Sequence, residues 1–197
     1  YRGDLIPVAA GITFPLTMML GYTLLVLLKG AATEILLVYL IAAFGMSFTG
    51  FIDDMLGQRD TLGFKGHFTR LLVKGELTTG GLKAVAGGFL ALFAALLSSG
   101  SLGELVLNAL LIALFTNSMN LFDLRPGRCI KVFLIIILPT IIFTKSTVLP
   151  LVPLLGAVLA YFRYDLKAQA MMGDAGSNVL GAVLGLAVVL GLQFIPK

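Results

Sequence analysis

Charged residues are scarce in this chain, since Asp, Glu, Lys and Arg together make up only 12% of its 197 residues. Soluble globular domains carry about 25% charged residues, so this composition excludes an ordinary water-soluble protein. Hydrophobic residues account for 58% of the chain, and its mean hydropathy is +1.02. We therefore expect an integral membrane protein.

Cysteine and histidine are nearly absent, with Cys129 and His67 the single example of each. One cysteine excludes a disulfide within the chain, and the sequence contains no zinc-ligand cluster. It also lacks a Walker loop, a dinucleotide-binding glycine fingerprint and a nucleophile elbow, which argues against the enzyme classes that use them. His67 lies in a Gly-Phe-Lys-Gly-His segment, where we expect it to touch a phosphate or a headgroup rather than to act as a base.

Apolar runs recur along the whole chain, and most are near the ~20 residues that a helix needs to cross a bilayer. Lipid offers no hydrogen-bond partner to backbone N–H and C=O groups, so each span must be helical. The expected spans are about 5–28, 35–52, 82–97, 102–121, 132–144, 148–162 and 178–195. The sequence therefore predicts an all-α integral membrane protein in which residues 1–197 form one transmembrane domain, a bundle of about seven transmembrane helices.

Alternation of these spans places the polar segments 1–4, 53–81, 122–131 and 163–177 on one side of the membrane. Together with Lys83, just inside the third span, those segments carry 11 of the 14 Lys and Arg residues and eight of the ten acids. The positive-inside rule identifies this side as cytoplasmic. We expect active-site loops on the cytoplasmic face. Nucleic-acid binding has no support, because the basic residues lie close to the membrane surface.

Two adjacent carboxylates, Asp53 and Asp54, end the second span. Two carboxylates are energetically unfavourable near hydrocarbon and repel each other, so the pair is expected to bind a metal, a cation or a substrate. The alternative is a plain acidic helix end in water, although an acid at a helix C-terminus is unfavourable with respect to the dipole.

Polar residues also end the fourth span, where Asn117, Asn120 and Asp123 recur at three-residue spacing and share roughly one helical face. Amide and carboxylate oxygens are hard ligands that suit Mg²⁺, although the same residues could form hydrogen bonds between helices. Three cations follow directly, and they either bind phosphate or satisfy the positive-inside rule: Arg125, Arg128 and Lys131.

A glycine-rich segment, 171–178, precedes the last span and contains Asp174. The glycines allow tight backbone approach, and the N-terminus of the following helix favours an anion. Asp174 is either a metal ligand or a helix cap. In the long polar segment, residues 64–74 have the spacing of a short interfacial amphipathic helix. Three basic residues in or beside this segment are weaker candidates for phosphate binding: Lys65, His67 and Lys83.

This set of motifs resembles that of the polyprenyl-phosphate N-acetylhexosamine-1-phosphate transferases, in glycosyltransferase family 4. The shared features are Asp-Asp at one span end, Asn-x-x-Asn-x-x-Asp at another and Met-Gly-Asp-x-Gly-Ser before a third, in the same order and on the same side. The opening Tyr-Arg-Gly-Asp-Leu-Ile-Pro is also similar to a motif of that family. The resemblance runs over nearly the whole chain.

The resemblance implies a Mg²⁺-dependent transfer of a sugar-1-phosphate from a UDP-sugar to a polyprenyl phosphate such as undecaprenyl phosphate, releasing UMP. Asn120 and Asp174 match the positions that hold Mg²⁺ in relatives. Asp53 and Asp54 match a pair beside the lipid and diphosphate phosphates, one of which deprotonates the lipid phosphate or attacks covalently. Asp123 matches the first aspartate of the family signature. The implied setting is a bacterial cell membrane and cell-wall synthesis, and homodimers occur among relatives.

The chain departs from the family at the positions that read the nucleotide. Pro126 stands where the signature has a second aspartate, associated with uracil, and Met171 stands where some relatives stack an aromatic ring. We expect fewer spans than is usual in the family, and no counterpart of the cytoplasmic His-rich loop that helps to choose the sugar in many relatives. The alternatives are therefore a non-catalytic relative that presents polyprenyl phosphate to a partner and, ranked last, a transporter.

Overall fold

The computed structural model describes residues 5–29, 34–57, 79–143 and 148–193, and this part of the chain is helical apart from short turns and an extended N-terminal segment. Its elements are η1 (Ala10–Ile12), α1 (Thr13–Lys29), α2 (Glu34–Leu56), α4 (Thr79–Leu96), α5 (Leu102–Phe122), α6 (Arg128–Phe143), α7 (Val148–Leu166) and α8 (Gly173–Gln193). Five of them (η1 and α1 together, α2, α5, α7 and α8) are long and apolar enough to cross a membrane, and α4 is a shorter apolar helix. This confirms the predicted all-α polytopic membrane architecture. The predicted interfacial helix, with Lys65 and His67, lies outside the described residues.

Several helices extend further into the polar segments than the hydropathy indicates. The helix α2 continues through Asp53 and Asp54 to Leu56, and α8 begins at Gly173 rather than near residue 178. At the N-terminus the opposite holds, because residues 5–9 are not helical and α1 begins only at Thr13. The acidic pair therefore belongs to the last turns of one helix, and Asp174 belongs to the first turn of another.

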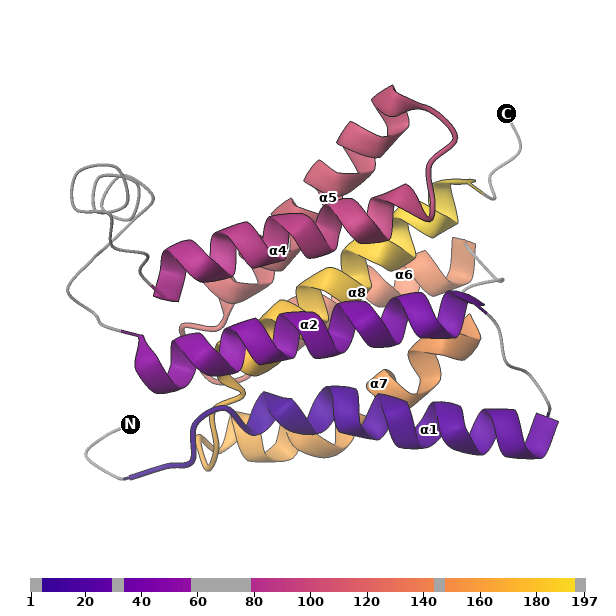
Figure 1. Cartoon of the computed structure of the whole chain (residues 1–197). Helices are drawn as coiled ribbons and strands as arrows, with labels where there is room; N and C mark the ends of the chain where they lie inside the picture. Colours follow the sequence, from indigo (N-terminus) through magenta and orange to yellow (C-terminus); the bar gives the residue numbers. More distant parts are fainter. Residues whose placement is uncertain (1–4, 30–33, 58–78, 144–147, 194–197) are drawn as a thin grey trace, which may run out of the picture.

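The helix α8 lies at the centre of the bundle (Figure 1), where it packs mainly against α5 and α2 and also contacts α6 and α1. Most of its residues are buried, whereas few residues of α5 are fully buried, as expected of a helix with one face toward lipid. Lipid tails supply no hydrophobic drive for helix association, so close packing at small residues matters. A Cβ at Gly181 would overlap the backbone of α5 at Thr116, and one at Gly50 of α2 would overlap the backbone at Asp174.

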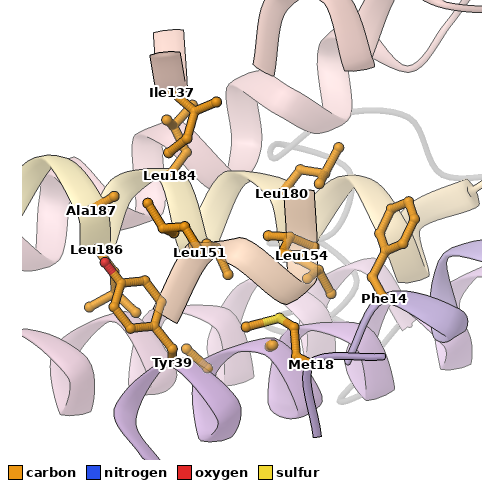
Figure 2. Packing of buried hydrophobic residues seen from close by; sticks show 14 of the residues in the cluster. Phe14, Met18, Tyr39, Ile137, Leu151, Leu154, Leu180, Leu184, Leu186 and Ala187 are labelled. Atoms are coloured by element: carbon orange, nitrogen blue, oxygen red, sulfur yellow. The ribbon is translucent and has the colours of Figure 1, made fainter. Parts of the chain in front are cut away.

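Figure 2 shows the apolar core that holds α8 in place, with side chains from α1, α7 and α8 interleaved. Phe14 and Met18 of α1 and Leu154 of α7 are fully buried together with Leu180 of α8. The α1–α7 contact also contains Tyr22, whose hydroxyl donates a hydrogen bond of 2.6 Å to the Pro150 carbonyl oxygen. The central helix is therefore closely packed on the side that faces α1 and α7.

The described parts of the polar segments that alternation places on one side converge at one end of the bundle, as predicted. Figure 1 shows the end of α2 at the same side as the beginnings of α4 and α8. The N-terminal segment joins them through backbone hydrogen bonds, because Met171 N–H donates to Pro7 O (2.9 Å) and Ala10 N–H donates to Met171 O (3.0 Å). We call this end, formed by residues 5–11, 53–57, 79–83, 117–131 and 163–178, the polar end.

Candidate active site

Asp54 caps the central helix rather than projecting freely. Its Oδ1 accepts the backbone N–H of Asp174 at 2.9 Å, and its Oδ2 accepts that of Ala175 at 3.0 Å. The first N–H groups of a helix have no partner within the helix, and the dipole there favours a negative charge. Gly173, just before, has φ +65, and a Cβ at this position would overlap the Asp54 carboxylate. The glycine therefore permits the cap, and the cap places Asp174.

Lys83 joins the two other carboxylates of this cluster. Its Nζ lies 2.9 Å from Oδ2 of Asp53 and also donates to Oδ2 of Asp174. The three residues come from three helices, α4, α2 and α8, and all three side chains are partly buried. Counting Asp54, three carboxylates face one ammonium group. The cluster therefore retains negative charge that a bound cation would balance.

An amide from α5 completes the cluster. Asn120 Nδ2 lies 3.4 Å from Oδ2 of Asp174, and its Oδ1 accepts a hydrogen bond of 3.2 Å from the hydroxyl of Ser177. Ser177 is fully buried and lies one turn after Asp174 on α8. Its role did not emerge from the sequence. The available signal was its three-residue spacing from Asp174, which puts both side chains near one face of the helix.

Asp123 follows α5 directly, as its C-cap, and its backbone N–H donates to Asn120 O at 3.1 Å. Burial raises the pKa of its carboxyl to about 8, with the negative charges of Asp165, Asp174 and Asp54 adding to the effect and Arg128 opposing it. Near neutral pH this carboxyl therefore holds its proton for much of the time. In that form it donates a hydrogen bond and does not act as a base.

Asp165 is a second residue that the sequence did not single out. It is only 5% exposed, near the end of α7, and its Oδ2 accepts the backbone N–H of Gly127 at 2.8 Å. Gly127 has φ +74, so the turn between α5 and α6 uses a backbone conformation that favours glycine. The hydrogen bond fixes that turn against α7. An acid in the last turn of a helix, against the dipole, was the signal that could have indicated it.

The basic residues after α5 do not all face the acidic cluster. Arg128 donates from Nε to Phe122 O (2.9 Å) and from Nη2 to Leu121 O (3.2 Å), so its guanidinium caps the C-terminus of α5. Capping accounts for its position without a substrate. Three other predicted substrate-binding residues are exposed at the polar end: Asn117, Arg125 and Lys131.

Comparison with known proteins identifies the family. The model of glycosyl transferase family 4 matches residues 36–192. The chain belongs to this family. It is 31% identical over 201 residues to a phospho-N-acetylmuramoyl-pentapeptide-transferase of Deinococcus radiodurans, a match that covers 93% of this chain and 61% of the relative. It is also 31% identical over 212 residues to the enzyme of that name from Chlamydia abortus, covering 93% of this chain and 59% of the relative.

The chain thus spans about three fifths of the length of these curated relatives. No solved structure matches it significantly. The matched segment contains Asp53, Asp54, Lys83, Asn120 and Asp174, so the whole cluster at the polar end lies within the family's part of the chain.

The donor set of this family 4 site fits Mg²⁺ better than a transition metal. Within the described ranges, no three His, Cys, Asp or Glu residues are grouped as a ready-made metal cluster. Mg²⁺ does not need one, because it usually binds one or two carboxylates and completes its shell with water and substrate phosphate oxygens. Asp174 and Asp53 offer carboxylate oxygens, and Asn120 can offer an amide oxygen if its amide turns. Their hard oxygen atoms are the type that Mg²⁺ prefers.

Proposed function

We propose that this family 4 protein transfers a sugar-1-phosphate from a UDP-sugar to a polyprenyl phosphate at the cytoplasmic face of a bacterial cell membrane. The observation that carries the proposal is the carboxylate cluster at the N-terminus of α8, where Asp53 and Asp174 share the ammonium of Lys83. A site that only gripped a lipid phosphate would not need several carboxylates near an anion. With a divalent cation between them, the same carboxylates become a binding site for a diphosphate.

Mg²⁺ would be held by Asp174, Asp53 and Asn120, and it would neutralise the diphosphate and stabilise the departing nucleotide. The protein's own residues divide the remaining work. Asp54 is committed to the backbone of α8, which makes Asp53 the better candidate to take a proton from the lipid phosphate, through the carboxylate oxygen that would not bind Mg²⁺. Asp123 is better suited to donating a hydrogen bond to a phosphate oxygen.

A binding module that presents polyprenyl phosphate is the second candidate, and the replaced nucleotide-reading positions favour it. Pro126 takes the place of an acidic residue, and the neighbouring Gly127 is held by Asp165. Met171 is exposed at the rim of the polar end, where a flexible thioether replaces a flat ring. Both changes lie at positions that are associated with the nucleotide base in relatives, and neither alters the carboxylate cluster.

An exchange assay on the purified protein separates the two candidates. With Mg²⁺, undecaprenyl phosphate and a panel of UDP-sugars, labelled UMP entering the UDP-sugar pool or a lipid-linked sugar product supports the transferase. Asp174→Asn should lower this activity by roughly 100-fold or more, because a site organised around one metal loses its main ligand. The matched control is Glu104→Gln, an acid-to-amide change in the first turn of α5, the helix end away from Asn120.

Other results contradict the proposal. Full turnover by Asp174→Asn would remove that residue from the metal site. Binding of lipid phosphate without turnover, on UDP-sugars and on sugars of other nucleotides, would favour the binding module.

A further inference from the structure

Lys83 is in an unusual place for a lysine. It lies in the fifth position of α4, near the N-terminus, where the helix dipole disfavours a positive charge. Its ammonium is instead stabilised by Asp53 of α2 and Asp174 of α8. The four-carbon stem of lysine is flexible and its ammonium is a compact point charge, so the group can change partners without movement of the helix.

The oxygen of Asp174 that receives Lys83 also receives a second donor. Asn120 Nδ2 lies 3.4 Å from the same Oδ2 atom. A divalent cation that binds through this oxygen meets a positive ammonium and the hydrogens of an amide, both of which repel it. Binding of the cation therefore requires both donors to give way.

Ser177 lowers the energetic cost of turning the Asn120 side-chain amide. Its hydroxyl now donates to Asn120 Oδ1 at 3.2 Å, but a hydroxyl accepts hydrogen bonds as readily as it donates them. If the amide turns over, its Nδ2 donates to Ser177 and its Oδ1 faces Asp174. The buried serine therefore satisfies the amide in either orientation.

We propose that Lys83 and a divalent cation compete for the Asp53–Asp174 pair, and that binding of the cation transfers the Lys83 ammonium from these carboxylates to a phosphate oxygen of the substrate. The inference rests on the proposed function, since it needs a metal and a phosphate at this site. It adds that one side chain holds the carboxylates together before the cation arrives and binds the anion afterwards. Metal binding and phosphate binding are coupled through that residue.

The test measures metal binding without turnover. Mn²⁺, a paramagnetic ion that accepts the same oxygen ligands, is titrated into the purified full chain and followed by electron paramagnetic resonance. Lys83→Met should bind Mn²⁺ on the order of tenfold or more tightly than the unaltered protein, because a unit charge close to a double charge is removed. Lys167→Met, which deletes an exposed lysine at the same end, is the matched control and should bind Mn²⁺ as the unaltered protein does.

A second titration adds inorganic pyrophosphate in the presence of saturating Mn²⁺. Here Lys83→Met should bind several-fold more weakly, because the ammonium that would reach the phosphate oxygens is gone. The opposite signs of the two effects distinguish an exchanging lysine from a fixed one. Lys83→Gln keeps a hydrogen-bond donor between the carboxylates without the charge, and serves as the second variant if Lys83→Met does not fold.

Each contrary result has its own meaning. If Lys83→Met and Lys83→Gln bind Mn²⁺ no more tightly than the unaltered protein, the exchange is wrong while the transferase proposal stands. If both titrations show weaker binding, Lys83 is a fixed bridge, and the exchange is again overturned. If the unaltered protein and every variant fail to bind Mn²⁺, the metal assignment of the proposed function fails as well.

Discussion

Replacement of Asp123 by asparagine should stabilise the protein, and more so as the pH rises. The carboxyl has a pKa of about 8 in the folded protein, against 3.8 for a water-exposed aspartate such as that of the unfolded chain. Because the folded pKa is the higher one, the folded state binds more protons between about pH 4 and pH 8. Folding stability therefore falls as the pH rises through that window, and the full cost applies above it. An asparagine at this position does not titrate, so this cost disappears.

The size of the effect follows from the shift. A shift of this size corresponds to roughly 6 kcal/mol at 1.36 kcal/mol per pH unit, which is an upper bound. Asp123 is partly exposed, so water screens its charge, and ~2–3 kcal/mol is the reasonable expectation above pH 8. Near pH 5, about 1.2 units above the unfolded pKa, the difference from this source should fall to roughly 1.5 kcal/mol.

The assay is thermal unfolding in detergent, from pH 5 to pH 9, of the unaltered protein, Asp123→Asn and Asp123→Glu. The asparagine variant should gain in midpoint temperature over the unaltered protein as the pH rises. The glutamate variant keeps a titrating group in the same place and should retain the original pH slope. A difference that stays constant with pH, or that shrinks toward pH 9, would show that Asp123 is ionised in the folded protein, and the reasoning would be wrong.

Two further predictions concern the packing of α8. Asp54→Asn should lower the free energy of unfolding by roughly 1–3 kcal/mol, because one charged cap on two backbone N–H groups is lost, and thermal unfolding measures this at neutral pH. An unchanged midpoint would show that the cap is dispensable. Gly181→Ala should cost ~1–3 kcal/mol, since the new Cβ would overlap α5 at Thr116. Gly88→Ala, where a Cβ meets nothing within 4 Å, is the control and should leave the midpoint unchanged or raise it slightly. Equal effects of the two alanines would contradict the close α5–α8 contact.

Much of the architecture could be predicted because it depends on properties that add along the chain. Hydropathy located the helices, and their alternation brought Asp53, Asn120 and Asp174 to one end, which the structure confirms. The ends of the helices were harder to predict from hydropathy, because a helix continues past its apolar run wherever its last polar groups find partners. Asp54 illustrates this, since it belongs to α2 only because α8 supplies N–H donors for it.

The individual partners could not be predicted from the sequence. Lys83 was a weak candidate for phosphate binding, and only the packing of three helices shows that it bridges residues 30 positions before it and 91 positions after it. The partners of Ser177 and Asp165 could not be predicted either, because their hydrogen bonds depend on the rotation of each helix about its axis. Arg128 was expected either to bind phosphate or to satisfy the positive-inside rule, and the carbonyl groups of α5 that it caps are not visible in a pattern of residue types.

The central position of α8 has a consequence for how the molecule is made. A ribosome completes α1, α2, α5 and α6 before it synthesises the helix that all of them contact. Until that moment the faces of these helices that will contact α8 are without it, and Asp54 has no helix to cap. The site therefore forms only when α8 packs between these helices, because Asp53, Asp54, Lys83 and Asn120 meet Asp174 only there.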